Sequence, residues 1–506
     1  MQDILQALAT IFTPNVMLFM LIGVAVGSLI GALPGLSVTM AIALLTPMTF
    51  WLEPAQGLAM MLGVYNSGVW AGGISAILIN TPGTPASIMQ TMDGYTMTQR
   101  GDAGMALGIN TVYSVIGGIF STIILMIAAI PIANFALNFG PAEYAMLAVF
   151  GLSMIISISG KSILKGIIAG LIGFLISTIG QDSMLGYPRY TFGVLELFDG
   201  VPFVAMMIGL FGISEVLAQI VDTTKEQHQQ SSFHGKIGRI LPKGKMMLKY
   251  LPTTLMSCVI GTLVGAIPGA GGDIASIIAW DQARKVSKEH DEFGKGSPEG
   301  LAVTSLANNA VIGGAMTTML SLGVPGDAAT AVLIGTLMIY GVTPGPLMFI
   351  DHLPMVYGIM IMMIVANLFI LVLGLATAKV SAKALNKLSA RTLWVAILIL
   401  CFLGAYAINN SIVDVWIMLI AGALGFIFRK MDIPLAPIVL ALVLGPMAES
   451  NLRRMLVITQ GSYAQLVTHP IALILLIISV GSLIVAFFQN RKAARKAAAR
   501  AQMPQE

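Results

Sequence analysis

The segment LIGALPG, Leu29–Gly35, occurs again in altered form as LVGAIPG, Leu263–Gly269, and this pair of segments decides the fold. Each copy places a Pro-Gly pair inside an otherwise apolar stretch, which covers residues 16–50 in the first case and 251–280 in the second. A proline lacks the backbone N–H that an uninterrupted helix uses, and its ring clashes with the preceding turn. Each stretch is therefore predicted to form a helix that is broken at its Pro-Gly pair.

The match between the two copies continues downstream of the breaks. QGLA at Gln56–Ala59 corresponds to EGLA at Glu299–Ala302, and TPGT at Thr81–Thr84 corresponds to VPGD at Val324–Asp327. The later motif is a turn between two apolar arms, so a re-entrant helical hairpin is predicted after each broken helix. Matched copies of this kind indicate two structural repeats. The predicted first repeat covers 1–221, with its broken helix at 16–50 and its hairpin at 57–103. The predicted second repeat covers 251–488, with its broken helix at 251–280 and its hairpin at 299–350. A basic loop at 222–250 separates the repeats, and a basic tail follows at 489–506.

The composition of the chain places these repeats in a membrane. Of the 506 residues, 57% are hydrophobic and only 10% are charged, and the mean hydropathy is +0.88. Soluble domains carry about 25% charged residues, whereas apolar stretches of about 20 residues span a bilayer. We therefore predict an all-α polytopic membrane protein in the lipid bilayer, and a soluble enzyme is excluded. Further spans are predicted near 104–131, 141–158, 162–180, 201–221, 355–378, 393–409, 411–428, 433–447 and 470–488.

The basic residues predict how the chain is oriented. Lysine and arginine concentrate in cytoplasmic loops, so the loop 222–250 and the tail 489–506 are predicted to be cytoplasmic and the N-terminus periplasmic. In this topology each broken helix crosses the membrane once and each hairpin turns back, which leaves the charged insert 281–297 outside. An odd number of crossings then separates the starts of the two copies, so the repeats are predicted to be inverted.

Inverted repeats with discontinuous helices are typical of secondary transporters, whose substrate site lies near the membrane midplane where the repeats meet. The hairpin tips INTPGTPAS, Ile79–Ser87, and LGVPGDAAT, Leu322–Thr330, would each expose the N-terminus of a returning helix. Free N–H groups and the positive end of the helix dipole favour an anion there. An ordinary turn capped by Asp327 is the alternative interpretation. The predicted substrate-binding residues are Pro34, Gly35, Ser37, Asn80, Thr81, Pro82, Gly83, Thr84, Ser87, Pro268, Gly269, Gly271, Pro325, Gly326 and Thr330.

Polar residues inside apolar segments are the candidates for coupling to a cation. A carboxylate within the membrane is a functional hypothesis by default, and Asp273 and Asp327 follow the second break and occupy the second tip. Asn66, Asn308 and Asn309 add neutral oxygen ligands, although hydrogen bonds between helices would explain them equally well. Either carboxylate could bind Na⁺ or carry a proton.

Other chemistry finds little support in the sequence. No zinc-protease, hydrolase or phosphate-loop motif is present, and the two cysteines, Cys258 and Cys401, lie in apolar runs as small buried side chains. We therefore expect no enzyme activity, no cofactor and no metal beyond a transported Na⁺. The net charge of +4 is modest and confined to a few loops, so nucleic acid is not an expected partner.

The stretch GALPGLSVTMAIALLTPMTF, the run GVYNSGVWAGGISAILINTPGTPAS and its echo GAIPGAGGDIASIIAW…LGVPGDAAT resemble the large membrane subunit of the tripartite tricarboxylate transporter family. The resemblance covers almost the whole chain. It implies a secondary transporter of the bacterial inner membrane, with citrate-like tricarboxylates or other small carboxylates as substrates and a Na⁺ or proton gradient as the driving force. The implied partners are a small four-span membrane subunit and a periplasmic solute-binding protein. The hairpin-bearing units are expected to move against a scaffold, as in an elevator-type transporter.

Three other functions are compatible with a polytopic chain. An ion or solute channel subunit would favour identical subunits around a pore, which an internal inverted repeat does not need. An intramembrane enzyme should carry a catalytic pair at helical spacing, and the sequence has none. A passive scaffold needs no helix breaks. The breaks therefore favour the transporter.

Overall fold

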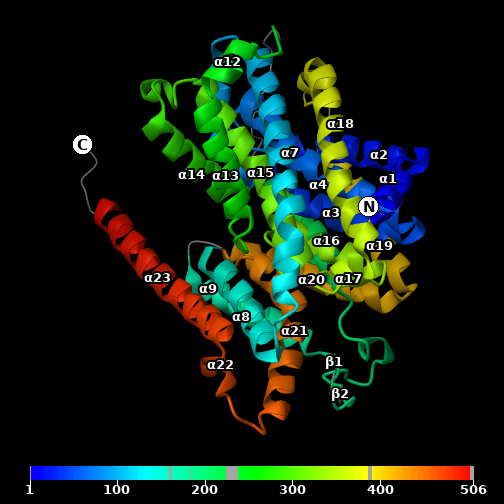
Figure 1. Ribbon diagram of the computed structural model, residues 1–506. Helices are drawn as coiled ribbons and strands as arrows, with labels where there is room; N and C mark the ends of the chain where they lie inside the picture. The colour runs from blue at the N-terminus through cyan, green and yellow to red at the C-terminus, as the bar shows by residue number, and fades with distance from the viewer. Residues whose placement is uncertain (1, 159–161, 183, 224–237, 386–389, 502–506) are drawn as a thin grey trace.

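The computed structural model confirms an all-α polytopic membrane protein (Figure 1). It describes residues 2–158, 162–182, 184–223, 238–385 and 390–501, so part of the predicted basic loop and the end of the predicted tail lie outside the described residues. Within these ranges, seven helices are long and apolar enough to cross a membrane. They are Pro14–Gly31, Pro54–Ile79, Ala103–Ala136, Phe203–Val221, Leu353–Ala378, Ile412–Lys430 and Pro470–Phe488.

The helices begin and end close to the predicted apolar segments. The first half contains α1 (Gln2–Ile11), α2 (Pro14–Gly31), α3 (Val38–Leu45), η1 (Thr46–Trp51), α4 (Pro54–Ile79), η2 (Pro85–Ser87), α5 (Ile88–Gln90), η3 (Thr91–Tyr95), α6 (Thr96–Gln99), α7 (Ala103–Ala136), α8 (Pro141–Ile158), α9 (Ile163–Ser177), β1 (Gly180–Gln181), β2 (Pro188–Arg189), η4 (Leu195–Leu197), α10 (Phe203–Met207), η5 (Ile208–Ile213) and α11 (Ser214–Thr223). The second half contains α12 (Gly244–Lys249), α13 (Leu251–Gly265), α14 (Gly271–Val286), η6 (His290–Glu292), α15 (Pro298–Leu322), α16 (Ala328–Ile339), α17 (Met348–Asp351), α18 (Leu353–Leu385), α19 (Ala390–Asn409), α20 (Ile412–Lys430), α21 (Ala436–Ile458), α22 (Gln465–Thr468) and α23 (Pro470–Ala501).

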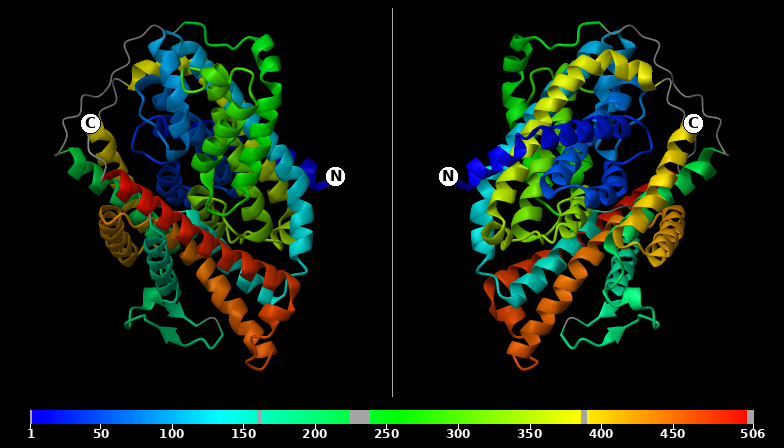
Figure 2. Two further views of the ribbon diagram at one scale, coloured as in Figure 1. Left: turned by 90° about the vertical axis from the view of Figure 1, so that its left-hand side faces the viewer. Right: turned by 90° about the vertical axis from the view of Figure 1, so that its right-hand side faces the viewer.

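The helices form two packed groups (Figures 1 and 2). Residues 2–136 and 238–385, which we call the broken-helix unit, contain both Pro-Gly breaks. Residues 141–223 and 390–501, which we call the flanking unit, pack α8 and α9 against α21, α8 against α23, and α10, η5 and α11 against α20. The long helices α7 and α18 belong to the first unit and pack on each other.

In the second copy, the broken stretch turns back at its break. Lys249 and Tyr250, at the start of α13, contact Glu289, which follows the end of α14: the lysine forms an ion pair and the tyrosine hydroxyl donates a hydrogen bond of 3.2 Å. The two outer ends of this stretch therefore lie together, at the end of the molecule that carries α12 and the insert 281–297 (Figure 1).

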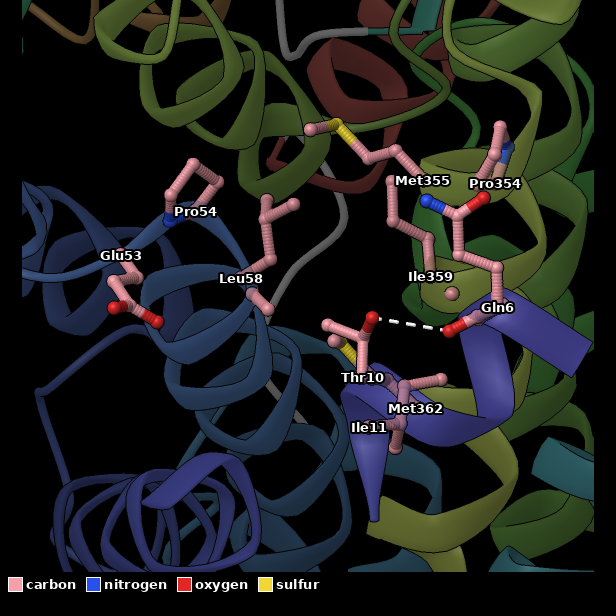
Figure 3. A pocket seen from close by; sticks show the side chains of 13 residues that line it. Gln6, Thr10, Ile11, Glu53, Pro54, Leu58, Pro354, Met355, Ile359 and Met362 are labelled. Carbon is pink, nitrogen blue, oxygen red and sulfur yellow. Dashed lines mark hydrogen bonds between the residues drawn. The ribbon is translucent and has the colours of Figure 1, made fainter. Parts of the chain in front are cut away.

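The first copy repeats this arrangement at the opposite end of the unit. Gln6 and Ile11 of α1, just before α2, line one cavity with Glu53 and Pro54, which follow the return of the chain through α3 and η1. Figure 3 shows these side chains around an apolar space, with the start of α18 closing its far side. The stretch that contains α2 and α3 therefore also begins and ends at the same side.

The stretches predicted as re-entrant hairpins cross the unit instead. The helix α4 starts beside α1, and the chain leaves it through Asn80 and then folds back so that Gly83 donates a hydrogen bond of 3.1 Å to the carbonyl of Gly72. From there it runs on in the direction of α4: Gly94 lies against Ile77, and Gly104, at the start of α7, lies beside the carbonyl of Arg239. Only the tip turns back, and the segment as a whole passes from one end of the unit to the other.

This geometry corrects the predicted topology, in which the broken stretches cross and the insert 281–297 lies opposite the loop 222–250. The insert lies beside α12 and the start of α13, at the same end as residues 238–250, which are the described residues of that loop next to α13. The physical reason is that a helix broken by Pro-Gly has the same apolar pattern whether it continues across the bilayer or returns. In each copy the broken stretch no longer crosses and the following stretch does, so the number of crossings is the same. The predicted sides of the two termini are therefore unchanged. Both these sides and the inverted orientation of the repeats stay predictions.

Glycines hold the helix before each break against the long helix that follows the broken stretch. A Cβ atom on Gly23, Gly27 or Gly31 of α2 would lie within 2.6 Å of backbone or side-chain atoms of α4. In the second copy, a Cβ atom on Gly261 would lie 2.6 Å from the Ala307 carbonyl oxygen, and one on Gly265 would lie 2.2 Å from that of Val311. The spacing of four residues places these glycines on one face of each helix, where the neighbouring helix approaches closely.

The flanking unit carries a small β-hairpin, β1 paired antiparallel with β2, at the end opposite α12 (Figure 1). Asp182 anchors it: its carboxylate accepts hydrogen bonds from the N–H groups of Leu185, at 2.8 Å, and Met184, at 2.9 Å, and pairs with Arg453 of α21. These backbone donors, together with Arg453, lower the pKa of Asp182 to about 2. The carboxylate therefore stays ionised at neutral pH and keeps the hairpin attached to α21.

Candidate functional site

A cavity of about 630 Å³ lies where both breaks and both tips meet the flanking unit. From the breaks it is lined by Ser37, Val38, Thr39, Gly269, Gly271, Gly272 and Asp273, and from the tips by Thr84, Pro85, Ala86, Asp327, Ala328 and Ala329. The flanking unit closes it with Phe211, Arg429, Ile433, Pro434, Leu435, Ala436 and Leu440, and α4 with Tyr65 and Val69. Both predicted repeats therefore contribute to one space.

The N-termini of three helices converge on this cavity. Ser37 caps α3, accepting a hydrogen bond of 3.1 Å from the N–H of Met40, and Asp327 caps α16. The first residues of α14 line the cavity directly, and Gly271 reaches it with φ +63°, a conformation that side chains rarely tolerate. The first turn of a helix has N–H groups without intrahelical partners and the positive end of the dipole, so the cavity favours an anion.

The two tips use the same capping geometry. In the second tip, the Asp327 N–H donates to Thr330 Oγ1 at 3.0 Å and the Thr330 N–H donates to Asp327 Oδ1 at 2.7 Å. In the first tip, the Thr84 N–H donates to Ser87 Oγ at 3.3 Å. Ser87 and Thr330 are fully buried in these caps, so they hold the tips and do not line the cavity.

Asp327 joins the two copies. Its Oδ2 accepts a hydrogen bond of 2.6 Å from the hydroxyl of Tyr65, which is fully buried on α4 of the first copy. Since Oδ1 accepts from both the N–H and the hydroxyl of Thr330, both oxygens of this carboxylate already have donors. Capping therefore accounts for the hydrogen bonds of Oδ1, whereas the bond of Oδ2 to Tyr65 is a contact between the two copies, and the carboxyl group also lines the cavity.

Asp273 is the second carboxylate of the cavity, and it lies in the first turn of α14. Next to it, Asn308 places its Oδ1 so close to Gly272 that a Cβ atom there would lie only 2.5 Å away. This oxygen is buried and has no hydrogen-bond partner among the described residues. A carboxylate and an unpartnered amide oxygen therefore lie next to the same turn.

The other two asparagines lie within the helix packing. Asn66 accepts a hydrogen bond of 3.1 Å from Asn367 of α18 and donates to the Leu62 carbonyl at 2.9 Å. Asn309 is fully buried, and neither atom of its amide group has a partner among the described residues. Neither side chain lines the cavity, so the structure separates them from Asp273 and Asp327.

The tip glycines lie where the chain passes closest to the breaks. A Cβ atom on Gly83 would lie 2.1 Å from the Gly31 carbonyl oxygen, and one on Gly326 would lie 2.6 Å from that of Gly265. The Gly269 N–H donates to the Gly326 carbonyl at 2.6 Å, which ties the second tip to the second break. Gly83 and Gly326 do not line the cavity themselves, but their close contacts fix the tips that do.

Of the predicted substrate-binding residues, Ser37, Thr84, Gly269 and Gly271 line the cavity. Asn80 and Thr81 are exposed at the outer turn of the first tip, away from it. The remaining predicted residues are not among those that line the cavity: Pro34, Gly35, Pro82, Gly83, Ser87, Pro268, Pro325, Gly326 and Thr330. Their part in binding a substrate stays a prediction.

Sequence reasoning missed Arg429. It stands at the end of α20, directly after the predicted span 411–428, yet it lines the cavity and forms an ion pair with Glu215 of α11. Tyr65 was missed in the same way. The sequence did carry a signal for Arg429, namely a basic residue directly after an apolar span. Such a residue can pair with an acidic side chain of a helix that packs against the same end.

Comparisons with known proteins identify the family of the chain. A family model described as the tripartite tricarboxylate transporter TctA family matches residues 17–440. A protein of Agrobacterium vitis, described as an uncharacterized 52.8 kDa protein in the TAR-I ttuC' 3' region, is 34% identical over 499 residues, which cover 98% of each chain. Another protein of that species, described as an uncharacterized protein in the TAR-II ttuC' 3' region, is 34% identical over 235 residues, 46% of this chain and 97% of the relative. No solved structure matches the chain. The chain belongs to the tripartite tricarboxylate transporter TctA family.

Proposed function

We propose that the chain is the large subunit of a secondary transporter that imports citrate-like tricarboxylates or related small carboxylates. The observation that carries this proposal is the cavity, in which helix N-termini from both copies, an arginine and two carboxylates line one space. A carboxylate substrate needs donors that replace its water shell and still release it. Helix N-termini and hydroxyl groups supply such donors without a rigid set of ion pairs.

We further propose that a cation travels with the substrate and binds at Asp273. Two acidic side chains in a cavity that favours anions would repel a carboxylate unless a cation were bound with it. The unpartnered Oδ1 of Asn308 beside Gly272 supplies a second oxygen ligand of the kind that Na⁺ prefers. A proton on Asp273 would serve the same purpose, and the test below separates the two.

The partners and location that we propose follow from the family. A periplasmic solute-binding protein delivers the carboxylate, a small four-span subunit completes the membrane complex, and the site of action is the bacterial inner membrane. Several apolar helices and membership of the family support a multi-pass membrane protein.

The decisive experiment measures uptake of labelled citrate, and in parallel of succinate and malate, into cells that make this chain with both partners. Each component is omitted in turn, and Na⁺ is replaced by choline or the proton gradient is collapsed. Uptake that needs all components and one gradient is the expected result. Absence of uptake of every carboxylate, with all components in the membrane, would contradict the proposal, and uptake down a gradient without the binding protein would favour a channel.

The Asp273→Asn substitution tests the cation site. It removes the charge that balances the cation, so we expect the Na⁺ concentration for half-maximal uptake, or the dependence of uptake on pH, to change by about tenfold or more. Asp281→Asn is the matched control, because Asp281 lies on the same helix but pairs with Lys285 at the surface, at 2.5 Å. A cation dependence equal to that of the unaltered chain would remove Asp273 from the proposed site.

A further inference from the structure

Arg429 is the single lysine or arginine among the residues that line the cavity. It comes from α20 of the flanking unit, whereas both carboxylates of the cavity come from the broken-helix unit. Its side chain is 32% exposed, so it is accessible from the cavity without being free in solvent. Among the described residues that line the cavity, this guanidinium group is therefore the basic side chain that can meet an anion.

Within the described part of the chain, Glu215 holds the guanidinium group through Nη1. Nη1 pairs with Oε2 of Glu215, whose side chain is 9% exposed, and the other oxygen of Glu215 accepts a hydrogen bond of 3.0 Å from Gln219. Nε of Arg429 is buried and has no acceptor among the described residues. A buried donor without a partner loses its hydrogen bond to water and gains nothing in exchange, so the edge formed by Nε and Nη2 favours an incoming acceptor.

We propose that the Nε–Nη2 edge of Arg429 binds one carboxylate group of the transported substrate, while Glu215 holds the guanidinium group in place through Nη1. This assignment rests on the proposed function and names a binding group for it. An arginine edge presents two parallel N–H donors that match the two oxygens of a carboxylate. Glu215 is then a positioning residue, since it orients Arg429 and does not itself contact the substrate.

The arrangement also explains why the site can release its substrate. An isolated arginine in an apolar site would bind a carboxylate tightly, whereas Glu215 neutralises most of its charge before the substrate arrives. The chain of contacts continues to the first break. Gln219 Nε2 lies so near Gly35 that a Cβ atom on Gly35 would be only 2.5 Å from it. Substrate contact at Arg429 is thereby linked, through Glu215 and Gln219, to the first Pro-Gly break.

The test compares Arg429→Gln, Glu215→Gln and the double variant in the complete transporter. The readouts are the citrate concentration for half-maximal uptake and the rise in melting temperature that citrate causes in the purified chain. We expect Arg429→Gln to weaken citrate binding by about tenfold or more, Glu215→Gln to change it less, and the double variant to stay as weak as Arg429→Gln. Lys430→Gln is the control. Lys430 is the next residue along the chain, its side chain is exposed, and its Nζ lies over the ring of Phe426.

A purely structural ion pair predicts the opposite pattern. Both single variants would then lose binding and stability to the same extent, and the double variant would recover both, since two neutral side chains no longer leave a buried charge unpaired. That recovery, or unchanged citrate binding in Arg429→Gln, would overturn the assignment. Arg429→Lys keeps the charge and removes the second donor of the edge, so it supplies the same comparison if Arg429→Gln does not accumulate in the membrane.

The same experiment separates this inference from the proposed function. If the unaltered transporter takes up none of the carboxylates tested, the proposed function fails and the assignment of Arg429 fails with it. If the unaltered transporter works and Arg429→Gln binds citrate as well as it does, only the assignment of Arg429 is overturned.

Discussion

At the scale of single residues, the tip glycines leave no room for a side chain. Gly83 and Gly326 lie at equivalent positions in the two copies, and each lies against the carbonyl oxygen of a glycine that precedes a break. Contacts of 2.1 to 2.6 Å are far below van der Waals separation, and the neighbouring atoms belong to backbone that cannot swing aside.

We expect Gly83→Val and Gly326→Val to abolish uptake. The added side chain would push each tip away from its break and open the cavity, while the long helices that anchor the chain in the membrane stay folded. Uptake and the amount of protein in the membrane are the two measurements. Gly481→Val in α23 is the control, because nothing lies within 4 Å of the Cβ position there. Normal uptake by either tip variant would show that its tip is an ordinary turn.

The sequence predicts the tip glycines and the caps because these residues occur in matched pairs. Arg429 and Glu215 have no such match, and their contact joins segments far apart in the chain. Burial and the partner of a charge depend on packing between helices, which a single sequence does not contain. For this reason the helix N-termini of the site were predicted, whereas its positive side chain was missed.

At the scale of elements, Asp93 fixes the insert 281–297 to the first copy. The carboxylate is fully buried: Oδ1 accepts hydrogen bonds from the N–H groups of Gly294, Gly296 and Ser297 at 2.8 to 3.1 Å, and Oδ2 accepts one from Trp280 Nε1 at 2.9 Å. Four hydrogen-bond donors converge on this buried carboxyl group, and the loop is held by them. Nothing in the sequence marks Asp93, since its partners lie about two hundred residues further along the chain.

We expect Asp93→Asn to loosen this insert. The amide group of asparagine keeps one acceptor oxygen, but its NH₂ group then faces N–H donors and cannot accept from them. Each buried donor left without an acceptor costs about 1 to 3 kcal/mol of stability. Limited proteolysis of the purified protein should then cut within 281–297 faster than in the unaltered chain. Asp291→Asn is the control, because that side chain is exposed and pairs with His290 at the surface. Equal cleavage rates in the unaltered chain, Asp93→Asn and Asp291→Asn would show that Asp93 does not hold the insert in place.

The elements themselves were predicted well, because their limits depend on local apolar pattern and on Pro-Gly breaks. The predicted span 141–158 coincides with α8, and the predicted span 393–409 ends with α19. The direction in which the chain leaves a break was predicted wrongly, since both directions bury the same apolar residues. Contacts such as that of Lys249 with Glu289 decide it, and these appear only in three dimensions.

At the scale of the whole molecule, the corrected topology is open to a direct test. Single cysteines at Lys245, Lys288 and Phe192 would be labelled with a membrane-impermeant maleimide in intact cells and in inverted vesicles. We expect the first two positions to react from one side and Phe192 from the other, because the insert lies beside α12 and the β-hairpin lies at the far end.

The native cysteines make this measurement clean, because Cys258 and Cys401 are both buried. A variant in which both are replaced by serine is the background control. Labelling of Lys288→Cys together with Phe192→Cys would restore the topology in which the broken stretches cross the membrane.

The position of Arg429 at the last turn of α20 has a consequence for the transport path. The cavity lies at the middle of the broken-helix unit, but it meets the flanking unit at the end of α20 and the start of α21. Measured along the flanking helices, the part of the cavity that Arg429 lines therefore lies near one end of the flanking unit. Arg429 pairs there with Glu215 of α11, the helix that leads into the loop 222–250. If that loop is cytoplasmic as predicted and the cavity binds the substrate as proposed, the substrate meets Arg429 at the cytoplasmic end of the flanking unit.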